Sequence, residues 1–431
     1  MPAIVAVVLA FGATYAICVR VNAGPAAAVL AVALAVGLSR SKPLSLRSLL
    51  TKIVTLPLIA LTAGIVGYLL MVAPPAGAAL FCAGIALSVW LRQYGAAASA
   101  LGRTIALPFM LMLVVPVPVG GAGSAALAMA AGVLALASTA LVSACVGWFA
   151  NETATGAAES RRVPRAARQG ELPVATRMAL QMLAALVLAF AIGLLAFPSH
   201  WPWIVLTAFI VCSGAVGRGD AIYKGTLRFG GAFGGTLAAS IVAHIAFPND
   251  VAYAAVVFAV LFLGIALRQI NYAYWAACAT LIFALLQGSG ASNLTALFFV
   301  RMICILIGAL CGIVGTWFVY PIRTEHVVRR RVADALAALR EVVTSARDGT
   351  EPVAKGALLD FHVAQLERIA PPVRLHRVLF GAKNADDHPA ALIERTRWLL
   401  EQARAPDFDR SRLGAELRRL GGTVQGQTRL R

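Results

Sequence analysis

The chain has 431 residues, of which 60% are hydrophobic and only 13% are charged. A soluble domain has about 25% charged residues, so this composition excludes a soluble globular fold and indicates a polytopic membrane protein. A net charge of +18 is often seen in nucleic-acid-binding proteins, but Lys and Arg that flank membrane spans account for it here. We therefore expect the lipid bilayer, and no nucleic acid, as a partner.

Apolar runs of span length occur in two sets of six. A helix needs about 20 apolar residues to cross a bilayer. The first set lies near residues 3–19, 24–39, 53–73, 75–91, 95–116 and 122–149. The second set lies near residues 178–198, 201–215, 229–247, 250–267, 271–288 and 293–320. The sequence thus predicts an all-α fold with about twelve transmembrane helices.

Lys and Arg are concentrated in alternate connections between these runs. One set of connections carries fourteen of them, whereas only Arg20 lies near the other set. Basic connections stay on the cytoplasmic side of a membrane. The pattern therefore predicts that both termini are cytoplasmic.

The two sets of spans also repeat one unit. At an offset of 176 residues, Leu91-Arg92-Gln93 aligns with Leu267-Arg268-Gln269, and Lys52 aligns with Arg228. Because each unit has an even number of spans, we expect parallel repeats related by an axis along the membrane normal. The tail differs, with helical spacing of apolar residues and charged outer faces. The predicted parts are a six-span repeat at 1–150, a cytoplasmic linker at 151–177, a second six-span repeat at 178–322 and a helical cytoplasmic module at 323–431.

No motif for catalysis or metal binding occurs in the sequence. It has no Walker loop, no serine elbow and no zinc-type spacing of His and Cys. We therefore expect neither an enzyme nor a bound metal or cofactor. Of the six histidines, only His244 lies inside a predicted span. It is the candidate for proton coupling, and a packing histidine is the alternative.

Two arginines, Arg103 and Arg301, lie inside predicted spans. An arginine at the centre of a span costs about 2.5–3.5 kcal/mol and usually faces the bundle interior or a wet cavity. The interiors of the predicted spans contain no Asp or Glu, so an incoming organic anion is a candidate partner for each guanidinium. In the alternative interpretation, Arg301 snorkels outward and Arg103 marks a misplaced span boundary.

Basic residues also form two repeat-related pairs at predicted cytoplasmic helix ends, Lys52 with Arg228 and Arg92 with Arg268. Anchoring of the topology by positive charge is one interpretation of these pairs. The other is a basic vestibule, shared by the two halves, that binds substrate.

The segment 201–236 predicts a helix, a basic cytoplasmic loop and a glycine-rich helix. The loop is expected to carry Arg218, Asp220, Lys224 and Arg228. The helix after it has two small-xxx-small faces, Gly230 with Gly234 and Gly231 with Gly235. Close helix packing is the default interpretation of such faces.

The same segment resembles the fusaric acid resistance family, also called the aromatic acid exporter family. Trp203-Ile-Val-Leu-Thr207 and Arg228-x-x-Gly231-Ala232-x-x-Gly235 are similar to the family's Trp-x-x-Leu-Thr and Arg-x-x-Gly-Thr-x-x-Gly motifs, with Ala232 where Thr is usual. The resemblance implies a bacterial inner-membrane protein of two six-span units that exports aromatic carboxylic acids. The chain is also distantly similar to plant aluminium-activated malate channels.

Three functional hypotheses follow. The first is a permease that exports small organic anions such as aromatic carboxylates. The second is a passive anion channel, because the predicted spans lack an acid for proton coupling. The third is a non-transporting assembly or partner protein in which the cytoplasmic module is the functional part. A periplasmic adaptor and a second copy of the chain are the candidate protein partners.

Overall fold

The structure is a computed structural model that describes residues 46–114, 172–215, 217–242, 250–268, 270–286, 294–321, 324–347, 353–380 and 389–404. Every regular element in these ranges is a helix, as the composition predicted. The predicted spans at 3–19, 24–39 and 122–149, most of the linker at 151–177, and His244 lie outside the described residues.

The first group of helices comes from the first predicted repeat. It consists of α3 (Leu46–Val72), α4 (Pro74–Trp90), the 3₁₀ helix η1 (Leu91–Tyr94) and α5 (Ala96–Val114). α4 starts with Pro74 and Pro75 in its first turn, where a missing N–H costs nothing because that group has no intrahelical acceptor. η1 ends at Gly95, whose φ of 102° suits glycine.

The second group of helices comes from the second predicted repeat. It consists of α7 (Val174–Ala196), α8 (Trp201–Cys212), α9 (Arg218–Val242), α10 (Asp250–Leu267), α11 (Tyr272–Leu286) and α12 (Leu294–Phe318). α7, α8 and α12 pack against one another, and α9 packs on both α11 and α12. Together with α3 to α5, these helices fall on nine of the twelve predicted spans.

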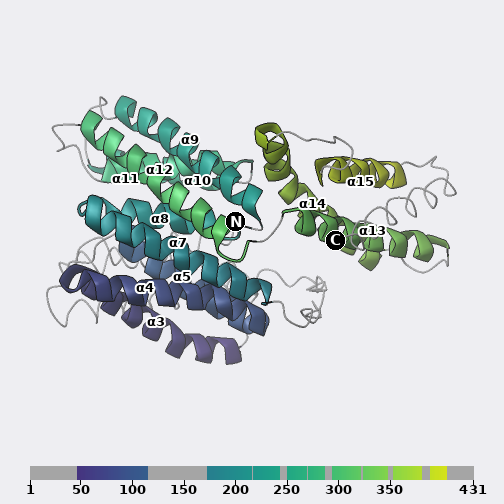
Figure 1. The fold of residues 1–431 in the computed structure, drawn as a ribbon, viewed down its shortest axis with the longest axis horizontal. Helices are drawn as coiled ribbons and strands as arrows, with labels where there is room; N and C mark the ends of the chain where they lie inside the picture. Colours follow the sequence, from purple (N-terminus) through teal and green to yellow (C-terminus); the bar gives the residue numbers. More distant parts are fainter. Residues whose placement is uncertain are drawn as a thin grey trace.

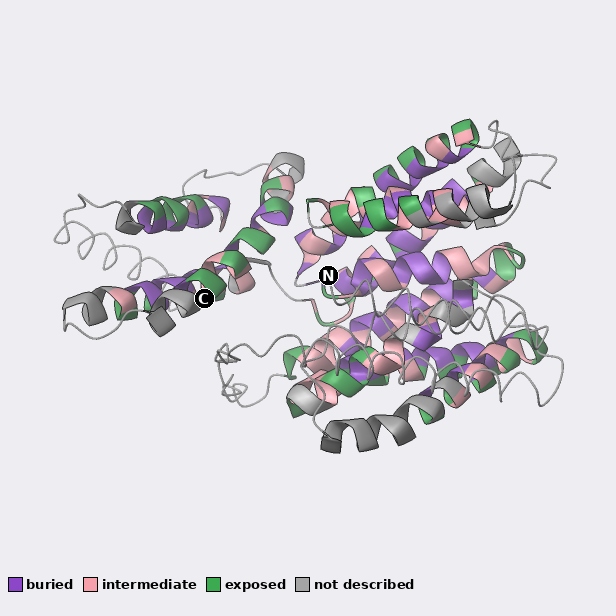
Figure 2. Cartoon of the chain, turned by 180° about the vertical axis from the view of Figure 1, so that it is seen from behind, coloured by how far each residue is buried: buried purple, intermediate pink, exposed green. Residues whose placement is uncertain are grey.

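One apolar core joins the two groups. α4 packs on α7, and the Phe81 ring of α4 meets the Phe190 ring of α7 edge-on with centroids 5.4 Å apart. Figure 2 shows buried residues along the facing sides of the helices and exposed residues on their outward sides. The outward sides include large apolar side chains such as Leu195, Leu310 and Phe318, which is the pattern expected of a surface that faces lipid rather than water.

Three of the described helical stretches are long and apolar enough to cross a membrane, namely Pro74–Tyr94, Val174–Ala196 and Phe299–Phe318. α8 is apolar but has only 12 residues. Its length of about 18 Å falls short of the hydrocarbon core of about 30 Å. The architecture of two six-span repeats stays a prediction, because the counterparts of α7, α8 and α12 lie outside the described residues.

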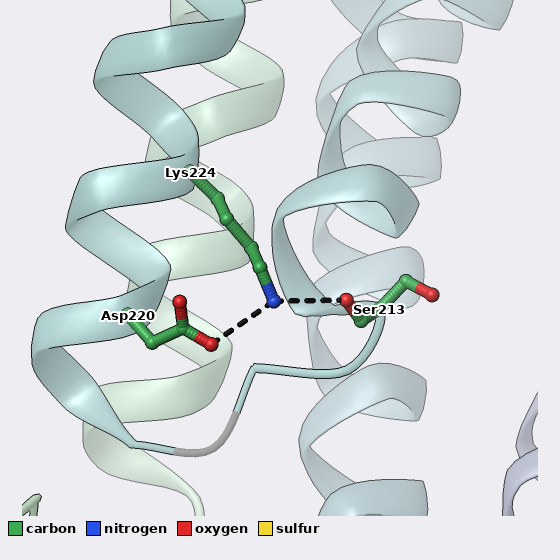
Figure 3. Close-up of polar contacts among 3 residues, drawn as sticks. All are labelled: Ser213, Asp220 and Lys224. Atoms are coloured by element: carbon green, nitrogen blue, oxygen red, sulfur yellow. Dashed lines mark hydrogen bonds and ion pairs between the residues drawn. The ribbon is translucent and has the colours of Figure 1, made fainter. Parts of the chain in front are cut away.

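The predicted cytoplasmic loop at residues 216–228 is wrong, because α9 begins at Arg218 and takes in the charged residues. Asp220 and Lys224 are one helical turn apart and form an ion pair of 3.0 Å. Lys224 Nζ also donates to the Ser213 carbonyl at 3.3 Å (Figure 3). These contacts satisfy the charges within a helix. Arg228 therefore lies about 15 Å into α9 rather than at its end.

The C-terminal module, residues 324–404, consists of α13 (Thr324–Arg347), α14 (Val353–Phe380) and α15 (Pro389–Arg404). It has a core of its own, with Val328, Leu339, Leu366 and Leu399 almost fully buried. The module stands beyond one end of the helix bundle, and α14 contacts α9 there (Figure 1).

Glycines set the closest helix contacts. A Cβ on Gly231 would collide with the Ala273 carbonyl oxygen of α11, and one on Gly235 would collide with the Ala277 carbonyl oxygen. No described atom lies within 4 Å of the Cβ position of Gly230 or Gly234. Of the two glycine faces in the sequence, the face of Gly231 and Gly235 is therefore the one packed against α11.

This difference gives a matched test of helix packing. Gly231→Ala should lower the free energy of unfolding by about 1–3 kcal/mol, since the added methyl group overpacks the contact with α11. Gly230→Ala adds the same methyl group on an open side and should leave the stability equal or slightly higher. Thermal unfolding in detergent, followed by tryptophan fluorescence, measures both. Equal midpoints for the two variants would contradict the packing.

Candidate functional site

Two arginines are buried together in the second helix group. Arg228 of α9 is 3% exposed and Arg301 of α12 is 6% exposed. Their guanidinium groups are close enough for the two positive charges to interact. α9 and α12 pack directly on each other, which brings together residues that are 73 positions apart in the sequence.

The spacing of the glycines explains the direction of Arg228. Gly231 and Gly235 follow Arg228 by three and seven positions, so all three lie on one side of α9. That side faces α11, and Tyr272, the first residue of α11, forms a side-chain hydrogen bond with Arg228. The Arg228 guanidinium is the donor, since it has no acceptor atom.

Arg301 is covered by an aromatic ring from a third helix. Its guanidinium carbon lies 4.0 Å from the centroid of the Trp203 ring, which is close for a cation–π contact. α8 brings the ring there because it packs along α12, where a Cβ on Gly308 would collide with the Ile204 carbonyl oxygen. α8 itself begins beside the ring, with Pro202 in its first turn.

Several polar atoms of this region lack a hydrogen-bond partner. They are Nε and Nη2 of Arg301 and Nε of Arg228, and no described residue accepts from them. The hydroxyl of Thr207, one turn after Trp203 on α8, is also buried without a partner. A buried cation without a counter-charge costs several kcal/mol, and Arg301 is the one arginine among the described residues that leaves two buried nitrogens unpartnered. Guanidinium donors of this kind suit an anion with oxygen acceptors.

Further cationic and aromatic groups interact with Arg228 or lie close to its partner Tyr272. Arg268, just after α10, is exposed and lies over the Trp275 ring, 5.7 Å from its centroid. Tyr272 interacts electrostatically with Arg268 as well as with Arg228. Tyr272 therefore interacts with one exposed and one buried arginine.

The remaining predicted site residues lie elsewhere or are not described. Arg103 is exposed on α5, and its Nη1 donates to the Ser99 hydroxyl at 2.9 Å. Arg92 is half-buried in η1. Lys52 belongs to α3, with a side chain outside the description, as is the whole of His244. The structure thus brings together Arg228 and Arg301, places Arg268 near them at the surface, and leaves Arg103 on a different helix group.

Trp203, Thr207 and Tyr272 were not predicted as site residues. The signal for the first two was present, since both belong to the Trp-x-x-Leu-Thr motif that precedes the arginine motif. Tyr272 gives no signal of its own in the sequence, because its role depends on the packing of α11 against α9.

Comparison with known proteins identifies this region. Residues 183–315 match the family model described as fusaric acid resistance protein-like, which confirms the resemblance of the motifs. The match extends from α7 into α12 and contains Trp203, Arg228, Tyr272 and Arg301. No curated protein and no solved structure matches the chain.

Because Arg301 is a buried cation without a described counter-charge, its replacement by an apolar residue should stabilise the protein. Arg301→Met should raise the free energy of unfolding of the ligand-free protein by about 1–4 kcal/mol, because it removes a buried cation without a counter-charge. Arg103→Met, at an exposed position, should change it by less than about 0.5 kcal/mol. Thermal unfolding in detergent measures both. A strong loss of stability in Arg301→Met would show that Arg301 is a paired structural residue.

Proposed function

We propose that the protein exports small organic anions across the bacterial inner membrane. Residues 183–315 match the fusaric acid resistance protein-like family model, which implies a membrane transport role. Aromatic carboxylates are the proposed substrates. The proposed architecture is two parallel six-span repeats with both termini in the cytoplasm. The single observation that carries the proposal is the buried pair of Arg228 and Arg301, with unpartnered donors on both residues.

The chemistry of the pair suits a carboxylate. A guanidinium group presents planar N–H donors that match the two oxygens of a carboxylate. Two such groups near each other repel, so a bound anion lowers the energy of both. Electrostatic attraction in a site this dry is much stronger than in water.

The surroundings of the pair suit an aromatic substrate. The Trp203 ring already covers the Arg301 guanidinium and offers an apolar surface for the substrate ring. In this proposal Tyr272 and the exposed Arg268, which both carry or contact positive charge, guide the substrate from the bundle surface to Arg228. The positive-inside pattern of the sequence puts that surface on the cytoplasmic side, where a substrate for export would enter.

Efflux of radiolabelled benzoate from liposomes containing the purified protein tests the proposal. Arg228→Gln and Arg301→Gln should each lower the rate about 10- to 100-fold, since each removes a charged hydrogen bond worth about 1.5–3 kcal/mol. Arg103→Gln should stay within about twofold of wild type, because the exposed pairing of Arg103 with Ser99 is worth at most a few tenths of a kcal/mol.

The opposite ranking, with Arg103→Gln impaired and the other two variants normal, would contradict the assignment of the site. Imposed pH and voltage gradients separate the two modes of transport. Flux that follows voltage and ignores the pH gradient would identify a passive channel. No flux under either gradient would favour the non-transporting hypothesis.

A further inference from the structure

The two helices that carry the buried arginines are tied together at the end nearest the C-terminal module. Arg218, the first residue of α9, donates from Nη2 to the Trp317 carbonyl of α12 at 3.0 Å. Trp317 Nε1 donates in return to the Arg218 carbonyl at 3.4 Å. The Arg218 guanidinium also lies 5.4 Å from the centroid of the Trp317 ring. This reciprocal contact ties the end of α9 to the end of α12.

The connection between α8 and α9 is held in the same region. α8 ends before Gly214, whose φ of 66° lies in the left-handed region that favours glycine. Lys224 reaches back from α9 to the Ser213 carbonyl while it pairs with Asp220 (Figure 3). The helix that carries Trp203 is thereby linked to the helix that carries Arg228.

The C-terminal module docks onto this region. α14 packs against α9, and a small hollow lies where they meet. The hollow is lined by Gly217 and Asp220 on the α9 side and by Val327, Val328, Ile369, Pro372 and Val373 on the module side. Among the described residues of that lining, Asp220 alone has a charged side chain, and the surface of the hollow itself is apolar. The Asp220 carboxylate beside it is paired with Lys224.

The module also follows α12 in the chain. Tyr320, between α12 and α13, has a φ of 42°, which is uncommon for a residue other than glycine. Gln181 Nε2 of α7 donates to the Tyr320 carbonyl at 3.1 Å. The module thus contacts α9 through α14 and follows α12 along the chain. These are the two helices that carry Arg228 and Arg301.

We propose that the C-terminal module is an autoinhibitory clamp on α9. In the docked arrangement Arg228 and Arg301 are 3% and 6% exposed, and this arrangement is the proposed closed state of the site. Arg228 lies eight residues beyond Asp220 on one continuous helix, about 12 Å along its axis. Release of α14 frees the end of α9 and lets the site open. The effect of the clamp on anion transport rests on the proposed function. The docking of α14 on α9 does not.

Opposite charges at one position of the hollow test the clamp. Val327 is half-buried and lines the hollow with Asp220. Val327→Glu adds a carboxylate that repels Asp220, whereas Val327→Lys adds a cation that attracts it, and both variants bury a charge. Val327→Glu should raise benzoate efflux about threefold over wild type, and Val327→Lys should leave it equal or lower. Ile369→Glu and Ile369→Lys repeat the comparison from α14 if the first pair does not fold.

Hydrogen exchange of residues 218–225 reports the docking separately from transport. Exchange should be faster in Val327→Glu than in Val327→Lys. Trp398→Glu, at an exposed position of α15, should alter neither exchange nor efflux. Equal efflux in Val327→Glu and Val327→Lys would contradict the clamp. So would faster hydrogen exchange in Val327→Glu without higher efflux, or no change in either exchange or efflux in that variant. If the wild type passes no benzoate, the proposed function fails, and the exchange difference alone decides whether the charge at this position controls docking.

Discussion

The burial of two guanidinium groups without a described counter-charge is the constraint on which the rest of the structure depends. Arg228 and Arg301 are held out of water by helices that approach closely, and the approach is set by glycines. Gly231 and Gly235 bring α9 onto α11, and Gly308 brings α12 onto α8. With larger residues at these positions the helices would separate and water would reach the arginines. The close helix packing at these glycines therefore keeps the two positively charged side chains buried in an apolar bundle.

The aromatic contacts moderate this charge without neutralising it. Trp203 lies on Arg301, and Tyr272 accepts from Arg228. Such contacts contribute less than a carboxylate would, so the site keeps an attraction for an anion. An Asp or Glu in their place would stabilise the empty protein and abolish that attraction. Arg103, in the first group of helices, differs from this pair because it is exposed and already donates a hydrogen bond to Ser99. It therefore has less attraction for an anion than Arg228 and Arg301.

Much of the fold could be predicted because composition and the length of apolar runs determine which segments form helices in a membrane. The start of α9 could not, because Asp220 and Lys224 pair within the helix where their charges had predicted a loop. The motif singled out Trp203 and Arg228, but their meeting with Arg301 depends on the packing of three helices. Hydropathy treats Arg103 and Arg301 alike, and only the packing shows that one is exposed and the other buried. The docking of α14 on α9 leaves no trace in either sequence segment.

The most direct test of the central claim is a structure of the protein with bound 4-bromobenzoate, whose bromine marks the ligand. We predict that the carboxylate lies between the guanidinium groups of Arg228 and Arg301 and takes up donors that are unpartnered in the empty site. The ring should lie against Trp203. A ligand bound elsewhere, with the two arginines still buried and unpartnered, would contradict the account.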